Sequence, residues 1–430
     1  MGKVFSVFEY DLLGSGKAAS VGAKVLLPPV FDYLESLSLT SHQGSQFLKL
    51  TSRSGFKLLQ VQNYAGILAT PHGLQLEILP KVGKNLTIAG ARKTFITMLS
   101  YLPWFRHIQT QQAALQAHHM PLLDIFISQF LQSVRLLLKQ GLRSDYVNKQ
   151  DNLHFMKGKL MLSAQLKHNL VKRHKFFVKY DDYLTNCAAN RLLHTALNRL
   201  RALNLSSENQ RLLYELSFPF DGIPLSQDIE SDINSLRIDR SMNYYNEPIA
   251  WAQVILRGMS PRALQGNIKT LSLLFPMETV FESFVAQTLQ GELPPHLKIK
   301  SQASVYSLVK HGTDECFKLR PDLLIQSRKP IQTKMVMDTK WKLLDSNSQK
   351  KTLYGLAQAD FYQMFAYGKK YLNGIGEMCL IYPAHDHFNQ PIPQHFAFSD
   401  TLKLWVVPYQ ITAKRGERMM WPKDMSSISI

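Results

Sequence analysis

The sequence predicts a multidomain protein that mixes α and β structure, with a β-rich N-terminal domain (1–93), a helical middle domain (94–260) and a C-terminal α/β domain (261–430). Short apolar segments separated by Gly, Pro and Ser fill the first part, as in small sheets. Apolar residues then recur at helical spacing, and the last part combines strand-like and helical segments. With 430 residues and 45% hydrophobic content, the chain is long enough for two or three cores.

The N-terminal part predicts a small sheet or barrel. Residues 74–78 alternate between apolar and polar side chains, and the Pro-His-Gly run at 71–73 predicts a hairpin turn before them. No cluster of catalytic residues is expected in this N-terminal part. The Gly-Ser-Gly-Lys run at 14–17 lacks the flanking residues of a phosphate-binding loop, so the chain is not expected to bind a nucleotide itself.

The middle part begins with a helical pattern that runs to about residue 142. Its apolar residues recur at three- and four-residue steps, which is typical of a helix packed against a core. The members of this stripe are Leu122, Ile125, Phe126, Phe130, Val134, Leu137 and Leu138. We interpret the stripe as core.

The segment 143–180 has a different character, because it holds nine Lys or Arg residues against two Asp residues. Such a run is either a solvated basic surface or a contact surface for phosphate or an acidic partner, and the sequence leaves both open. The whole chain carries a net charge of +18 and has a pI near 9.6. This charge indicates a polyanionic partner, most simply a nucleic acid.

Three cysteines, Cys187, Cys316 and Cys379, are widely separated and form no CxxC pair. A disulfide framework or a zinc site is therefore not expected, which suits a reducing cytosol. No run approaches the roughly 18 apolar residues that span a bilayer, and the first residues lack a signal-peptide core. The expected location is the cytoplasm, with no membrane partner.

The most informative residues lie in two strand-like segments, 319–326 (LRPDLLIQ) and 333–342 (TKMVMDTKWK), which a short turn separates. The first segment holds Asp322, and alternation along the second places Asp338 and Lys340 on one face. A buried strand has little reason to carry Asp and Lys together unless they meet a cation, a substrate phosphate or each other.

These residue types match metal-assisted cleavage of a phosphodiester. Asp322 and Asp338 would hold Mg²⁺ through oxygen, with the Thr339 carbonyl as a further ligand. Such a cation polarises the phosphoryl oxygen and lowers the pKa of its bound water. Lys340 would orient that water or offset charge on the phosphate. Glu282, on a preceding helix, would complete the ligand set or hold a metal-bound water.

The order of these residues is that of a PD-(D/E)xK nuclease core. A lone D-x-K triplet occurs by chance about once in a chain of this length, so the context carries the argument. Downstream, Gln363 and Tyr367 are four residues apart and therefore share a helix face, as in the QxxxY arrangement of RecB-like nucleases. The competing interpretation is a surface salt bridge between Asp338 and Lys340.

At this point the chain resembles the McrC family, the nuclease subunits of McrBC modified-cytosine restriction systems. The resemblance extends over most of the chain. It depends on an ordered set of segments: 66–83 (GILATPHGLQLEILPKVG), 141–146 (GLRSDY), 157–160 (KGKL), 180–193 (YDDYLTNCAANRLL), 281–284 (FESF), 321–325 (PDLLI), 337–342 (MDTKWK), 360–368 (DFYQMFAYG) and 381–383 (IYP). Each piece alone is weak, but the ordered set is specific.

The resemblance implies a partner, a McrB-like hexameric AAA+ GTPase that recognises modified DNA and binds the GTP. McrC-like proteins dock on that hexamer through their N-terminal and middle parts, stimulate GTP hydrolysis and cut double-stranded DNA containing modified cytosine. The segment 143–180 would then enter the ring, with Lys172, Arg173 and Lys175 as expected contacts. Two alternatives stay open: a stand-alone RecB-like or repair nuclease, and a non-catalytic structural activator of an AAA+ ring.

Overall fold

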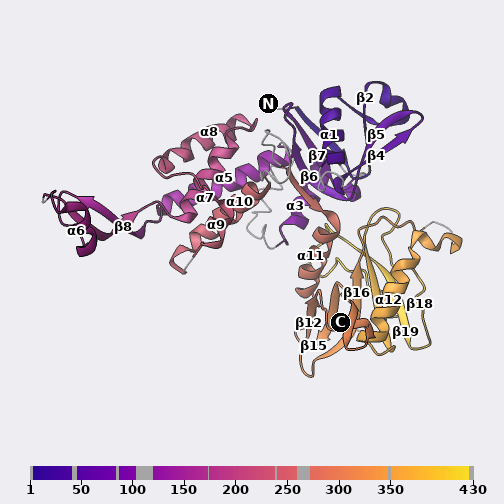
Figure 1. Cartoon of the computed structure of the whole chain (residues 1–430). Coiled ribbons are helices and arrows are strands. Elements are labelled where there is room, and N and C mark those ends of the chain that lie inside the picture. Colours follow the sequence, from indigo (N-terminus) through magenta and orange to yellow (C-terminus); the bar gives the residue numbers. More distant parts are fainter. Residues whose placement is uncertain are drawn as a thin grey trace. The chain divides into compact units, whose positions relative to one another are not determined.

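The computed structural model describes residues 3–40, 46–83, 87–102, 120–172, 174–237, 240–258, 272–346 and 350–425. The chain divides into two compact units. Unit 1 is formed by Leu123–Leu271 with Met1–Lys3, and unit 2 by Val4–Leu122 with Ser272–Ile430. The predicted mixture of several sheets and helices is confirmed (Figure 1). The predicted division into three domains stays a prediction.

The N-terminal part of unit 2 contains two four-stranded sheets. The first has the order β1 (Lys3–Phe8), β7 (Leu74–Leu79), β6 (Tyr64–Ala69) and β11 (Ser272–Pro276), and the second β3 (Lys24–Leu26), β2 (Leu12–Ser15), β5 (Phe56–Val61) and β4 (Leu48–Arg53). The predicted hairpin turn at 71–73 is confirmed, since β6 and β7 pair antiparallel. The helices of this part are α1 (Pro28–Thr40), which the sequence analysis did not predict, and α3 (Ile88–Leu99).

The strand β11 returns the chain from unit 1 to the N-terminal sheet. It pairs antiparallel with β6, and Leu274 lies opposite Gly66. Gly66 has φ +139°, and a Cβ atom there would lie 1.9 Å from the Leu273 carbonyl oxygen. Only glycine allows this close approach of the two backbones.

The C-terminal part of unit 2 is built on a six-stranded mixed sheet. Its order is β12 (Leu297–Ser301), β15 (Leu323–Ser327), β16 (Gln332–Thr339), β17 (Gly376–Pro383), β19 (Leu402–Tyr409) and β18 (Phe396–Ala397). The predicted hairpin of two strands is confirmed, because β15 and β16 pair antiparallel, whereas β17 runs parallel to β16 and to β19.

Two helices cover this sheet, α11 (Met277–Gln290) and α12 (Gln358–Tyr371). Val336 of β16 belongs to the same buried cluster as Met364 of α12. Phe281 of α11 instead packs against Tyr409 of β19, and Val406, three residues before Tyr409, faces the α12 side. Because successive strand residues point to opposite faces, the two helices lie on opposite faces of the sheet.

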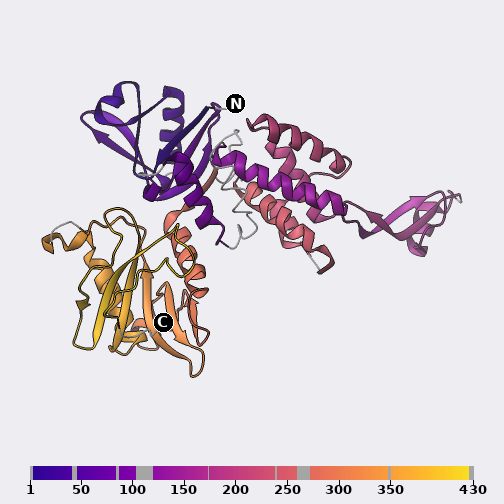
Figure 2. The same cartoon turned by 180° about the vertical axis from the view of Figure 1, so that it is seen from behind.

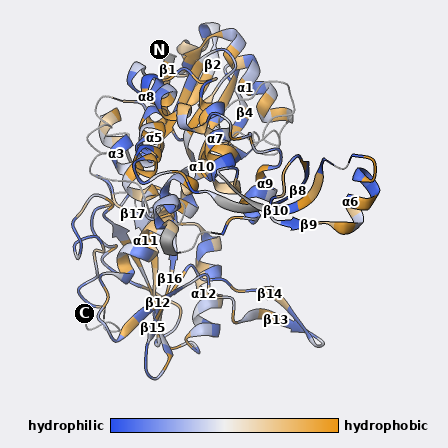
Figure 3. Cartoon of the chain, turned by 90° about the vertical axis from the view of Figure 1, so that its left-hand side faces the viewer, coloured by the Kyte–Doolittle hydropathy of each residue, from blue (hydrophilic) through white to orange (hydrophobic). Residues whose placement is uncertain are grey.

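A two-stranded ribbon, β13 (Ser307–His311) and β14 (Asp314–Lys318), projects from this part of unit 2 (Figure 3). It connects β12 to the segment that leads into β15. The hydroxyl of Tyr371 donates hydrogen bonds to the carbonyl oxygens of Ala303 and Leu319, both at 3.0 Å. The base of the ribbon is thereby fixed to α12.

Unit 1 consists of a group of helices and a long arm (Figure 2). The helices are α5 (Leu122–Gln140), α7 (Ala188–Leu200), α8 (Ser207–Ser217), α9 (Ile229–Asn234) and α10 (Asn246–Gly258). The predicted apolar stripe of α5 is confirmed as core, with only Leu138 half-buried. None of the helices in the described ranges is long and apolar enough to cross a membrane.

The basic segment 143–180 forms most of the arm. The arm is a ribbon of β8 (Asp145–Leu153) and β10 (Phe176–Leu184), extended by β9 (Lys159–Leu160) and α6 (Leu162–Asn169). Two amides hold α6 against the ribbon, because Asn169 and Asn152 exchange side-chain hydrogen bonds of 2.7 and 2.8 Å. The basic segment that the sequence indicates at 143–180 therefore forms most of a folded β-arm.

One buried amide fixes both ends of the arm. Asn190 of α7 donates to the carbonyl oxygens of Arg143, before β8, and Thr185, after β10, at 2.9 and 2.8 Å. The hydroxyl of Tyr245 donates to Asn190 Oδ1 at 2.7 Å and accepts the backbone N–H of Arg143 at 2.8 Å. We call Asn190, Tyr245, Arg143 and Thr185 the arm root.

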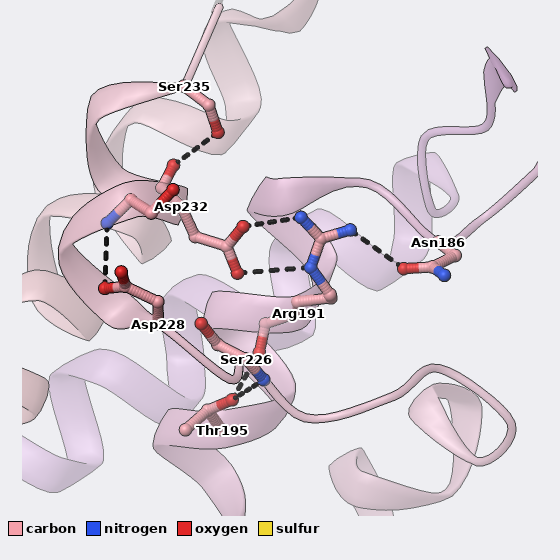
Figure 4. Close-up of polar contacts among 8 residues, drawn as sticks. Asn186, Arg191, Thr195, Ser226, Asp228, Asp232 and Ser235 are labelled. Carbon is pink, nitrogen blue, oxygen red and sulfur yellow. Dashed lines mark hydrogen bonds and ion pairs between the residues drawn. The ribbon is translucent and has the colours of Figure 1, made fainter.

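The next residue, Arg191, anchors α7 to α9 (Figure 4). Its guanidinium makes a two-pronged ion pair with Asp232, at 3.1 Å and 2.5 Å, and donates to Asn186 at 2.9 Å. Although burial opposes it, the hydrogen bonds from Arg191 lower the pKa of Asp232. Asn190 and Arg191, which are adjacent in the sequence segment 180–193, therefore both stabilise the base of the arm.

Candidate active site

The two predicted aspartates meet at the ends of β15 and β16. Leu323 pairs with Met337 in the antiparallel ladder, so the preceding Asp322 lies beside Asp338. Asp338 also pairs in register with Leu380 of the parallel strand β17. The charged residues are therefore flanked by the apolar interior of the sheet.

Asp322 is fixed by Thr339. Its Oδ2 atom accepts the backbone N–H of Thr339 at 2.8 Å and the Thr339 hydroxyl at 2.7 Å. Burial raises the pKa of Asp322 above its usual value, while these two hydrogen bonds oppose that shift. The amide and side chain of Thr339 thus orient Asp322, whereas metal binding by the Thr339 carbonyl stays a prediction.

Asp338 is 1% exposed and forms an ion pair of 2.7 Å with Lys340 through its Oδ2 atom. Burial, followed by the field of Asp322, raises the pKa of Asp338 to about 6, although Lys340 lowers it. In the described part of the chain, the Lys340 ammonium neutralises Oδ2, and no backbone N–H or hydroxyl donates to it. A buried carboxylate oxygen in this state is suited to receive a cation.

Lys340 follows the end of β16, and its backbone N–H donates to the Ile381 carbonyl at 2.8 Å. Its ammonium lies 2.9 Å from Gln363 Oε1 and 3.6 Å from Asp360 Oδ1, in addition to Asp338. Burial by itself would lower the pKa of Lys340, but the surrounding carboxylates raise it above its usual value. The interpretation as an exposed surface salt bridge therefore does not describe this pair.

The predicted helix face is present on α12. Gln363 accepts from Lys340 and donates through Nε2 to the Tyr367 hydroxyl at 2.9 Å. That hydroxyl donates to the Arg320 carbonyl at 3.0 Å, two residues before Asp322. Burial raises the pKa of Tyr367 to about 12, so it stays a hydrogen-bond donor at neutral pH. One chain of hydrogen bonds thus connects Lys340 to the segment that carries Asp322.

Asp360 was missed by the sequence analysis. It lies one turn before Gln363 on α12, close to Lys340, and accepts a hydrogen bond of 3.3 Å from Tyr382. The spacing of Asp360, Gln363 and Tyr367 at steps of three and four residues was a usable signal, because it puts all three on one helix face.

Glu282 of α11 faces the two aspartates. Burial, followed by the field of Asp322, raises the pKa of Glu282 to about 7, and Asp338 adds to the shift. Gln302, at the base of the ribbon, donates to Glu282 Oε1 at 2.5 Å. Glu278, one turn earlier, is exposed, and its charge acts on Tyr10 and Tyr64 instead. The structure therefore brings Glu282, and not Glu278, to this site.

The carboxylates do not form a closed cage. Within the described ranges, no group of three or more His, Cys, Asp or Glu side chains stands ready to surround an ion. Mg²⁺ usually binds through one or two carboxylates and keeps several waters. Asp322 and Asp338 fit such an open site, since they lie side by side, are half-buried and buried respectively, and have raised pKa values.

The predicted partner-contacting residues lie elsewhere, in unit 1. Lys172 is exposed near the tip of the arm, and Lys175 is half-buried with its backbone N–H bonded to the Lys172 carbonyl. Arg173 lies outside the described residues. The arm also exposes large apolar side chains, including Phe155, Leu166 and Val171.

Three comparisons place the chain among known proteins. A model of the McrBC 5-methylcytosine restriction system component family matches residues 59–383. A solved structure, the refined half-complex from a tetradecameric assembly of Thermococcus gammatolerans McrB AAA+ hexamers with bound McrC, has a chain that is 17% identical, with a TM-score of 0.69 and coverage of 96% of each chain. A cryo-EM structure of the Thermococcus gammatolerans McrBC complex gives 18% identity, a TM-score of 0.49 and coverage of 67% of this chain and 87% of that one. No curated protein matches.

Proposed function

The chain belongs to the McrBC 5-methylcytosine restriction system component family, and we propose that it is a McrC-type subunit with a PD-(D/E)xK-type, Mg²⁺-dependent DNA endonuclease site. The observation that carries this proposal is the convergence of Asp322, Asp338 and Lys340 at the ends of two paired strands. Thr339 fixes Asp322, Gln363 fixes Lys340, Lys340 pairs with Asp338, and the pKa of each of the three is raised. Titratable groups that lie close together and have shifted pKa values are typical of catalytic sites.

Asp322 and Asp338 would hold the Mg²⁺, which supplies polarisation of the phosphoryl oxygen and a water of lowered pKa. In this structure the Lys340 ammonium neutralises Asp338. Gln363 holds the same ammonium from the α12 side, so Lys340 is in position to offset negative charge on a phosphate. Glu282, whose pKa is about 7, is suited to accept a proton from the attacking water through its carboxylate oxygen.

We further propose that the partner is an AAA+ GTPase, which binds the GTP and recognises the modified cytosine in double-stranded DNA. The similar structure of McrC was determined bound to McrB AAA+ hexamers, and the fold similarity covers 96% of this chain. A folded basic arm with exposed apolar side chains at its end is suited to insertion into a protein ring. Stimulation of GTP hydrolysis is assigned to this arm.

The test is to combine the chain with an AAA+ GTPase partner and measure GTP hydrolysis and cleavage of methylated DNA in the same reaction. Asp338→Asn keeps the shape of the side chain but removes the charge that would bind the cation. It should abolish cleavage and leave GTPase stimulation intact. The matched control is Asp400→Asn, an exposed aspartate outside the site, which should cut at the wild-type rate.

The outcomes separate the alternatives. Cleavage by the wild-type chain without any partner would favour a stand-alone nuclease. GTPase stimulation without any cleavage by the wild type would favour a non-catalytic activator. Wild-type cleavage by Asp338→Asn would contradict the site assignment.

A further inference from the structure

A buried polar cluster joins the N-terminal sheet to the end of the strand that carries Asp338. Glu9 follows β1 and is 0% exposed. Its carboxylate accepts the backbone N–H of Lys81 at 2.8 Å and the indole N–H of Trp341 at 2.8 Å. All three residues belong to unit 2. Glu9 and Trp341 are 332 positions apart, so this contact exists only through the fold.

Lys81 reaches the same tryptophan from another direction. Its ammonium donates to the Trp341 backbone carbonyl at 2.8 Å and lies over the rings of Tyr10 and Trp341, at 4.9 and 5.4 Å from their centroids. Lys81 is itself buried. Burying a charge is costly unless the charge is hydrogen-bonded, so the hydrogen bonds to Trp341 help to stabilise the buried Glu9 and Lys81.

Trp341 is connected to two residues of the candidate active site, Lys340 and Glu282. It directly follows Lys340, at the point where the chain has left β16 and a backbone hydrogen bond to Ile381 ties Lys340 to the sheet. Its ring also packs against Phe281 of α11, with centroids 5.3 Å apart. Phe281 directly precedes Glu282. A displacement of Trp341 therefore acts on Lys340 through the backbone and on Glu282 through ring packing.

We propose that Glu9 and Lys81 are positioning residues of the nuclease site, which hold Trp341 so that Lys340 and Glu282 face the two aspartates. This inference rests on the proposed nuclease function and deepens it. The N-terminal sheet is then a structural support of the active site.

The test compares two buried glutamates of the same N-terminal sheet in the full complex with the GTPase partner. Glu9→Gln leaves one oxygen for two N–H donors and removes the negative charge beside Lys81. Glu77→Gln is the matched control, because Glu77 is also buried but bonds Arg92, the Ser6 hydroxyl and the Leu122 backbone N–H in place of Trp341. Both variants are compared at a temperature where circular dichroism shows them folded.

We expect Glu9→Gln to lower the single-turnover cleavage rate at saturating DNA by about tenfold. The Mg²⁺ concentration for half-maximal rate and the DNA concentration for half-saturation should stay within about twofold, because the aspartates are untouched. GTPase stimulation should also be unchanged. Glu77→Gln should lower the melting temperature but keep the wild-type cleavage rate, so loss of stability alone would not reproduce the effect.

Trp341→Phe is the second variant, because it keeps an aromatic ring beside Phe281 and removes the N–H that Glu9 accepts, together with part of the indole volume. It should slow cleavage like Glu9→Gln, and the double variant should be no slower than either single one, as for two members of one interaction. A wild-type rate in both single variants, or an equal loss in Glu77→Gln, overturns the proposal. If the wild-type complex cuts no DNA, the proposed function fails instead, and the two failures are distinguishable.

Discussion

Glu282 connects stability and catalysis in a single side chain. Its pKa of about 7 in the folded chain lies above that of an unfolded glutamate, about 4.3. A carboxyl group whose pKa is higher in the folded chain than in the unfolded chain favours the folded state at low pH. This contribution to stability is lost as the pH rises through the folded-state pKa of about 7. The ionised Glu282 beside two aspartates is therefore a destabilising group at pH 8.

We predict that Glu282→Gln raises the melting temperature at pH 8 and leaves it nearly unchanged at pH 4, because glutamine does not titrate. The same variant should slow cleavage at least tenfold, about 1.4 kcal/mol in the barrier. Thermal unfolding at the two pH values and a single-turnover cleavage assay measure both effects. The control is Glu278→Gln, an exposed residue that should change cleavage little. The reverse ranking of the two variants would move the third acidic residue to Glu278.

At the scale of elements, helix α12 holds Lys340 in place through Gln363 and Tyr367. The Tyr367 hydroxyl accepts from Gln363 and donates to the Arg320 carbonyl, so its loss leaves two polar groups without their partner. We predict that Tyr367→Phe lowers the cleavage rate about tenfold, with little change in the Mg²⁺ dependence. A magnesium titration under single-turnover conditions measures both quantities.

Tyr371→Phe is the control for this prediction. Tyr371 lies one turn further along α12 and bonds the base of the ribbon instead of Gln363. It should lose similar stability and keep the wild-type cleavage rate. Equal rates in the two variants would show that the hydroxyl of Tyr367 does not act through Lys340.

The arm root is the second element with a testable role. Tyr245 connects the Asn190 amide to the backbone of Arg143, and its hydroxyl is buried. We predict that Tyr245→Phe loosens the arm and lowers GTPase stimulation, at a cost of about 1–3 kcal/mol of stability for the unpaired groups. GTP hydrolysis measured against the concentration of the chain gives both maximal stimulation and apparent affinity.

The neighbouring Tyr244 provides the matched control. It packs against Tyr245, and Tyr244→Phe removes a hydroxyl that takes no part in the arm root. Stimulation should be unchanged in that variant. If Tyr245→Phe stimulates the GTPase as well as the wild type does, the arm root has no part in partner binding.

At the scale of the whole molecule, the two proposed activities reside in different compact units, the arm in unit 1 and the nuclease site in unit 2. We therefore predict that they separate by mutation. Asp338→Asn should keep GTPase stimulation and lose cleavage. Neutralising Lys172, Arg173 and Lys175 together should weaken GTPase stimulation or DNA engagement, and a smaller salt dependence would indicate lost phosphate contacts. An arm variant with unchanged stimulation and salt dependence would make this segment an ordinary solvated surface.

The sequence by itself predicted features that depend on local periodicity. The hairpin that carries Asp322 and Asp338 follows from alternation along two short segments, and the shared face of Gln363 and Tyr367 follows from their spacing on one helix. These patterns are visible because neighbours in sequence remain neighbours in a strand or a helix. The basic segment was visible as charge, but its ribbon form was not.

Only the tertiary structure decided which distant side chains meet. Glu282 was predicted from the sequence, but its position beside Asp322 and Asp338 depends on how α11 packs on the sheet, and the arm root joins Asn190 to residues on both sides of the arm. Glu9 and Trp341 are 332 positions apart in the sequence, and no local sequence pattern predicts their contact. Such contacts result from how sheets and helices pack, since burying their apolar faces determines which polar groups are enclosed together and must then satisfy one another.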